Sequence, residues 1–140
     1  MSMTFTVQVD WDADGSFATA GDDISAYVQG VSANLGIFDA RLDHVAYVGR
    51  CTITLDNTDR RFSPKYTAGP YYGKLLPNRA VRVQGTDGED TWTLWRGVIR
   101  RIVPEAARGG TRETVLECED AMGVLQAHLL SLPIQENKRG

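Results

Sequence analysis

The feature that most constrains this chain is an alternation of apolar and polar residues with a period of two. Successive side chains of a β-strand point to opposite faces of a sheet, so this alternation predicts strands with one buried face. It recurs in five segments, 5–11, 51–57, 80–86, 91–103 and 113–120. Turn-forming residues separate the segments, most clearly at Asp87-Gly88, where we expect a β-hairpin.

Helical periodicity is confined to the C-terminal side. Asp120 is placed to cap a helix over 121–132, and apolar residues recur near one face of it, namely Met122, Leu125, Leu129 and Leu132. One short helix beside many strands predicts a mainly β fold, a small antiparallel barrel or sandwich with one C-terminal helix. We assign this domain to 1–131 and interpret the polar stretch 132–140 as a linker toward a missing C-terminal part.

Composition narrows the class of protein. The chain has 140 residues, 42% of them apolar, which suits one globular domain with a hydrophobic core. The formal charge is −3 and the basic residues are scattered among acids, which argues against nucleic-acid readout. The first ten residues lack the basic and apolar regions of a secretory signal, and no run of about 18 apolar residues predicts a membrane span. We therefore expect synthesis and folding in the cytoplasm.

The two cysteines, Cys51 and Cys118, both fall inside strand-like segments. They are too few and too far apart in sequence for a disulfide framework or a Cys-x-x-Cys zinc site. We interpret them as buried free thiols.

An acidic segment near the N-terminus is similar to a calcium-binding loop. Asp10, Asp12, Asp14 and Gly15 match positions 1, 3, 5 and 6 of an EF-hand loop, but position 12, which needs a bidentate acid, is Gly21. Two interpretations stay open. The Asp side chains bond their own backbone in Asx-turns, with Asp14-Gly15 reversing the chain, or the three carboxylates form a weak calcium site that relieves their mutual repulsion.

The sequence offers no catalytic constellation. His44 and His128 have no nucleophile or metal ligand at a useful spacing, and we interpret both as surface or edge residues. Glu117 and Glu119 share one strand face, as a glycosidase pair would, but a solvated strand face explains them as well. We expect a protein that is not an enzyme and needs no cofactor.

Tryptophans provide the basis of one alternative function. Trp92 and Trp95 have opposite parity in one strand, so we expect them to face opposite sides of the sheet. A calcium-dependent carbohydrate-binding module would use Trp95 to stack on a sugar ring, with Asp10, Asp12 and Asp14 holding the ion.

The most distinctive stretch is 49–85, where a strand is followed by a compact turn and an aromatic excursion. Its motif residues are Asn57, Asp59, Arg61, Phe62, Pro64 and Gly73. Asn57 and Asp59 suit a turn that leaves the strand, and Phe62 suits an anchor that returns the chain to the core.

This combination resembles the N-terminal domain of minor tail or tail-hub proteins of bacteriophages and prophages. These typically carry an LxNxDRRFSP motif after a strand, then a YGxLxP motif and a VRV strand. The resemblance covers about 7–126. It implies a β-barrel related to the tail-tube and hub fold, without catalysis. It also implies assembly in the bacterial cytoplasm into a ring, a trimer or hexamer, at the tip or baseplate of a virion tail, in contact with other tail proteins.

Within the aromatic excursion, 65–77, we expect the surface that contacts a neighbouring subunit. Tyrosine supplies contact area at low entropic cost. The predicted interface residues are Tyr66, Tyr71, Tyr72 and Leu75. The alternative is that these tyrosines cover one end of the barrel within their own subunit.

Overall fold

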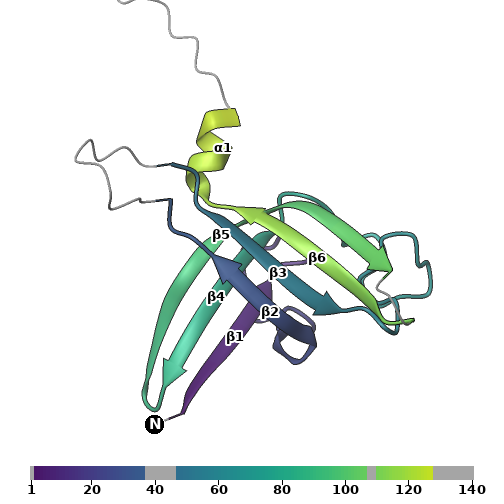
Figure 1. Cartoon of the computed structure of the whole chain (residues 1–140), viewed down its shortest axis with the longest axis horizontal. Helices are drawn as coiled ribbons and strands as arrows, with labels where there is room; N and C mark the ends of the chain where they lie inside the picture. The colour runs from purple at the N-terminus through teal and green to yellow at the C-terminus, as the bar shows by residue number, and fades with distance from the viewer. Residues whose placement is uncertain (1, 37–46, 107–109, 128–140) are drawn as a thin grey trace, which may run out of the picture.

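The structure, a computed structural model, describes residues 2–36, 47–106 and 110–127. Six antiparallel strands form one sheet in the order β1-β4-β5-β6-β3-β2 (Figure 1). Their bounds are β1 (Met3–Val9), β2 (Val28–Ala33), β3 (Arg50–Asp56), β4 (Ala80–Asp87), β5 (Asp90–Ala106) and β6 (Arg112–Glu119). A 3-10 turn, η1 (Ser25–Tyr27), precedes β2, and a short helix, α1 (Ala121–Ala127), follows β6.

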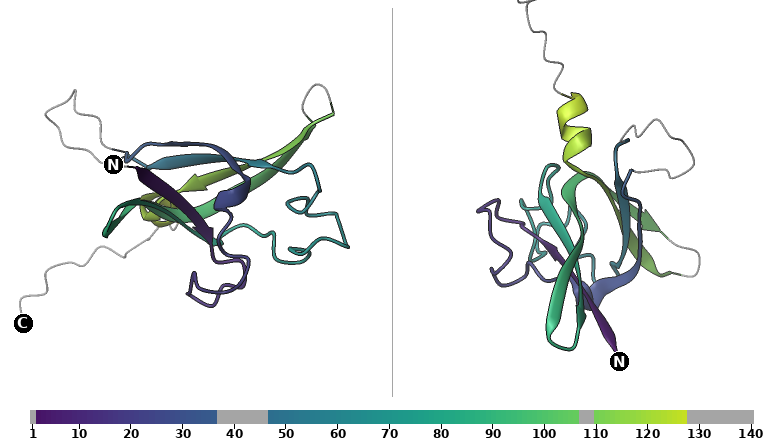
Figure 2. Two further views of the ribbon diagram at one scale, coloured as in Figure 1. Left: turned by 90° about the horizontal axis from the view of Figure 1, so that it is seen from below. Right: turned by 90° about the vertical axis from the view of Figure 1, so that its left-hand side faces the viewer.

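The sheet curls into a half-barrel with β1 and β2 as its two edge strands (Figures 1 and 2). Residues of both edge strands line one pocket. The sheet confirms the predicted fold class, a mainly β antiparallel architecture with one short C-terminal helix. All five predicted strands are present, and Gly88, with a φ of 64°, opens the two-residue turn of the β4–β5 hairpin. The sixth strand, β2, was not predicted.

The predicted helix cap is confirmed. One carboxylate oxygen of Asp120 accepts the backbone N–H of Met122 at 3.0 Å, and the other accepts the N–H of Gly49 at 2.9 Å. The same side chain therefore starts α1 and ties it to the beginning of β3. The rest of the predicted helix, including Leu129 and Leu132, and the predicted linker 132–140 lie outside the described residues.

Two irregularities bend the longest strand, β5. Its register against β4 shifts between Val83 and Gln84, which leaves Leu94 as an extra residue. Its register against β6 shifts between Ile99 and Arg101. An extra residue in one strand increases local twist and bends it, so these bulges help the sheet to curl.

The core lies against the concave face of the sheet. It combines inward-facing aliphatic residues of the strands with aromatic residues from the connections, Trp11, Phe62 and Tyr71. Cys51 and Cys118 are free and buried, as predicted. Among the helices that the structure describes, none is long and apolar enough to cross a membrane.

Candidate functional site

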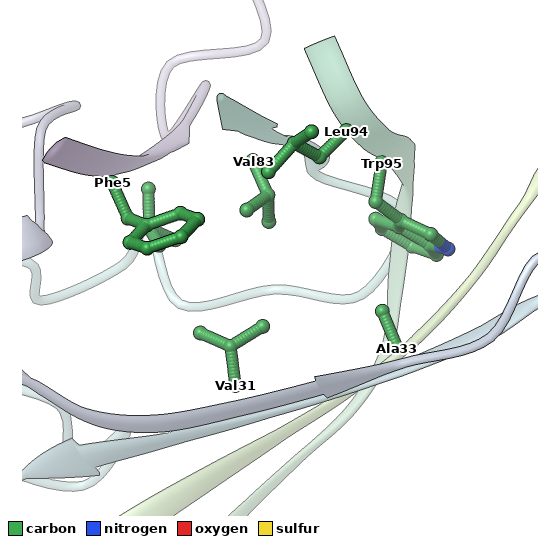
Figure 3. A pocket seen from close by; sticks show the side chains of 7 residues that line it. Phe5, Val31, Ala33, Val83, Leu94 and Trp95 are labelled. Carbon is green, nitrogen blue, oxygen red and sulfur yellow. The ribbon is translucent and has the colours of Figure 1, made fainter. Parts of the chain in front are cut away.

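The open side of the half-barrel carries an apolar pocket of about 370 Å³, which we call the mouth. Four strands line it with side chains that face one another across the opening (Figure 3). The lining residues are Phe5 and Val7 of β1, Val31 and Ala33 of β2, Val83 of β4, and Leu94 and Trp95 of β5. The mouth has the size of a small-ligand or peptide side-chain site.

The bulge at Leu94 places two tryptophans on the same face. Trp92 pairs with Gly85 and Trp95 pairs with Val83. Residues directly opposite each other in a sheet point to the same side, and Val83 and Gly85 share a face. The expectation that Trp92 and Trp95 face opposite sides was therefore wrong, because the extra residue Leu94 interrupts the alternation and turns both side chains to one face.

Large apolar side chains remain exposed around the mouth. Their exposed fractions run from 42% to 56%, in the order Val31, Leu94, Trp92, Met3 and Phe5. Trp95, in contrast, is 4% exposed and forms the floor. Scattered apolar residues are ordinary on a surface, but a patch gathered around a pocket marks an interaction site.

The backbone of β1 is open at its N-terminal end. The N–H of Asp10 donates to the carbonyl of Ala80, so even-numbered residues of β1 bond to β4 and odd-numbered residues point away from it. Val7 and Val9 use these outward groups to bond residues 22–25. Within the described residues the outward N–H and carbonyl of Phe5 have no such partner.

The backbone of β2 is open toward the same seam. The N–H of Asn34 donates to the carbonyl of Arg50, so even-numbered residues of β2 bond to β3. Val31 and Ala33 therefore turn their backbone groups away from the sheet, and none of the described segments bonds them. Two strand edges consequently flank one apolar pocket.

Charged residues and prolines, one form of protection that natural proteins place on edge strands, are absent from both edges. The sequences of β1, MTFTVQV, and β2, VQGVSA, contain no charged residue and no proline. Charges and prolines normally prevent an edge from pairing with another chain. Their absence leaves both edges competent to pair.

Three carboxylates stand at the open end of the mouth. Asp87, Glu89 and Asp90 lie at the tip of the β4–β5 hairpin, and Met3 pairs with Asp87 in the sheet. No ion pair to these three acids occurs within the described part of the chain. We call them the acidic tip.

The motif after β3 is a buried corner. The side-chain oxygen of Asn57 accepts the N–H of Phe62 at 2.9 Å, and its amide nitrogen donates to the hydroxyl of Ser63 at 2.8 Å. Asn57 is 1% exposed and Phe62 is fully buried, which confirms Phe62 as the predicted anchor. Pro64, exposed, follows this corner.

Asp59 and Arg61 brace the outside of that corner. Their side chains form an ion pair at 2.5 Å, and the guanidinium of Arg61 lies 4.0 Å from the ring centre of Tyr27, whose hydroxyl it also contacts. The hydrogen bonds from Arg61 lower the pKa of Asp59. These contacts hold the corner against η1.

The excursion is a run of consecutive turns. Backbone N–H groups donate to the carbonyl three residues earlier at residues 66, 69 and 72, which continues the turns of the preceding corner at residues 60 and 63. Gly73, with a φ of 78°, then reverses the chain in a left-handed conformation that favours glycine.

The four predicted interface residues of the excursion differ in their exposure. Tyr71 and Leu75 are buried in the core, and the hydroxyl of Tyr71 donates to the carbonyl of Gly21 at 2.9 Å. These two side chains pack within the subunit, as the alternative interpretation expects, and their part in an interface stays a prediction. Tyr66 is half-buried, and Tyr72 is 55% exposed.

The acidic loop makes internal bonds. The carboxylate of Asp10 accepts the N–H groups of Asp14 and Gly15, at 3.2 and 2.9 Å. The carboxylate of Asp14 accepts the N–H of Ser16. Asp12 forms an ion pair with Lys74 at 2.7 Å. These bonds are those of the turn interpretation. Across the described residues no group of three or more His, Cys, Asp or Glu side chains is placed to hold a metal, and the calcium hypothesis remains a prediction.

Of the polar residues considered for catalysis, the two glutamates form ion pairs and the two histidines lie outside the described residues. Glu117 pairs with Arg101 at 2.9 Å and Glu119 with Arg100 at 3.0 Å, both on the outer face of the sheet. His44 and His128 lie outside the described residues.

Comparison with known proteins adds no family assignment. No protein-family model matches the chain, and a search of curated proteins finds no significant match.

Proposed function

We propose that this chain is a structural module of a bacteriophage or prophage tail tip or baseplate, assembling as a ring subunit. The observation that carries the proposal is the mouth: exposed apolar side chains gathered at a pocket between two strand edges that carry no protecting charge. Such a surface suits contact with another protein chain. The resemblance of 49–85 to tail-hub domains supplies the setting.

A second exposed apolar surface supports head-to-tail assembly. Tyr72 and Leu76 are 55% and 47% exposed on the excursion, which lies on another side of the sheet from the β4–β5 hairpin (Figure 1). A subunit of a ring contacts its two neighbours through unlike surfaces, so two distinct patches suit a closed ring of three or six copies. The proposal assigns no catalysis to the chain.

The test is to locate the chain in particles. Tailed particles produced by the encoding bacterium would be purified and probed with antibodies against this chain in electron microscopy, with mass spectrometry of the same preparation. The expected result is labelling at one end of the tail, with a copy number that is a multiple of three. A chain that is abundant in the cell but absent from the particles would overturn the proposal.

A further inference from the structure

The mouth offers both an apolar pocket and free backbone hydrogen-bonding groups to a bound molecule. Phe5, Val31 and Ala33 line the pocket, and the backbone groups of the same three residues face the open seam. A bound molecule that fills the pocket therefore meets hydrogen-bond donors and acceptors at strand spacing. An extended peptide satisfies both requirements at once, whereas a small apolar ligand satisfies only one.

We propose that an extended segment of a different protein chain enters this seam, adds to the free edge of β1 and places alternate apolar side chains in the mouth. The inference rests on the proposed function only for the source of the segment, another tail protein. The seam is bounded at one end, where residues 22–25 cover the edge of β1 at Val7 and Val9. The free edge therefore begins at Phe5 and continues toward Met3.

A second copy of the chain fits this seam less well than a separate segment. Both free edges of each copy flank its own mouth, so a second copy that pairs with β1 brings its own half-barrel to the seam rather than a single strand. The six described strands are already paired within the sheet, and none is available to leave it without breaking a ladder. A segment without a sheet of its own, such as a chain terminus or linker, meets no such cost.

Charge indicates the chemistry of the segment and its direction. All pairs in the sheet are antiparallel, so a strand added to β1 in the same manner runs toward the N-terminal end of β1. Its C-terminal end then reaches the acidic tip, Asp87, Glu89 and Asp90. Opposite charge there is favourable, so the fitting segment alternates apolar and uncharged polar residues along its length and ends in Lys or Arg.

The experiment selects segments directly. A random-peptide display library would be selected on the full chain and, in parallel, on Phe5→Lys and Thr4→Lys. Both residues belong to β1, but Thr4 is exposed on the opposite face from the mouth and bonds β4, so Thr4→Lys is the matched control. The expected result is an enriched alternating pattern with a C-terminal basic residue, selected by the wild type and Thr4→Lys and lost on Phe5→Lys.

Variants then separate the backbone from the side chain, using the selected peptide as the probe. Met3→Ala and Met3→Pro remove the same side chain, but only the proline removes the outward N–H. Loss of one such bond is expected to weaken binding by about tenfold for Met3→Pro relative to Met3→Ala. Neutralising the tip with Glu89→Gln and Asp90→Asn should weaken only peptides that end in a basic residue.

Three results would overturn the inference. These are no enrichment over the library, equal selection by Phe5→Lys, and concentration-dependent self-association of the chain that Phe5→Lys abolishes, which would assign the mouth to a second copy. The selection uses the chain alone. A chain that selects such peptides but is absent from tail particles would therefore refute the proposed function and leave the inference standing.

Discussion

The side-chain oxygen of Asn57 accepts the backbone N–H of Phe62 at 2.9 Å, with both residues buried. Asn57→Leu keeps the volume but leaves that N–H without a partner, which should cost about 1–3 kcal/mol in the free energy of unfolding. Urea unfolding measures the loss. Thr67→Ala, at an exposed position of the excursion, is the control and should change stability by less than about 0.5 kcal/mol. Equal losses would mean that the corner is not held by Asn57.

Phe62 joins this corner to the core. Its ring stacks on Tyr71 at a centroid distance of 5.4 Å and also contacts Trp11. Phe62→Ala should therefore lower the free energy of unfolding by about 3–5 kcal/mol, as a core truncation. Tyr72→Ala, at an exposed aromatic residue of the excursion that follows this corner, should cost far less. A loss below about 1 kcal/mol for Phe62→Ala would contradict the anchor role.

Alkaline pH should destabilise the fold through its thiols. Burial raises the pKa of Cys51 from 9.0 to about 11, and raises the pKa of Cys118 as well. A raised pKa means that the folded state holds the proton more tightly than the unfolded state. The stabilising contribution of Cys51 is therefore complete below pH 9.0 and is lost as pH rises toward about 11.

Urea unfolding between these two pH values measures that loss. The slope of stability against pH should be smaller in Cys51→Ala, whatever the packing cost of the substitution. An unchanged slope would show that Cys51 does not titrate with folding.

The acidic loop should behave as a turn. Asp10→Ala removes the acceptor for the N–H groups of Asp14 and Gly15 and should destabilise the chain by about 1–3 kcal/mol, with or without calcium. The melting temperature of the wild-type chain should not move when millimolar calcium or a chelator is added. A rise with calcium that Asp10→Ala abolishes would favour the calcium interpretation instead.

Strands with sustained alternation, β5 among them, could be predicted from the sequence, whereas the positions of the bulges and the short strand β2 could not. In β2, Val28 and Val31 have opposite parity in the sequence, yet their partners Leu55 and Ile53 share one face, because the register shifts between Val28 and Gly30. The same effect at Leu94 brings Trp92 and Trp95 onto one face. A bulge depends on the partner strand, which a single sequence does not reveal.

The site was only partly predictable for a related reason. Asn57 and Phe62 indicate a local corner, and a local turn is determined by the few consecutive residues that form it. The mouth combines β1, β2, β4 and β5, which the topology alone brings together. One signal was present: β1 and β2 lack charged residues, although an edge strand normally carries them.

We propose that the mouth joins this chain to other tail proteins. The most direct measurement is incorporation of Phe5→Lys into tailed particles, relative to Thr4→Lys, by quantitative mass spectrometry of particles from cells that produce each variant. Phe5 is 56% exposed, so both variants should keep the melting temperature of the wild type. We predict that Phe5→Lys is excluded from particles while Thr4→Lys enters at wild-type level. Normal incorporation of a folded Phe5→Lys would contradict the claim.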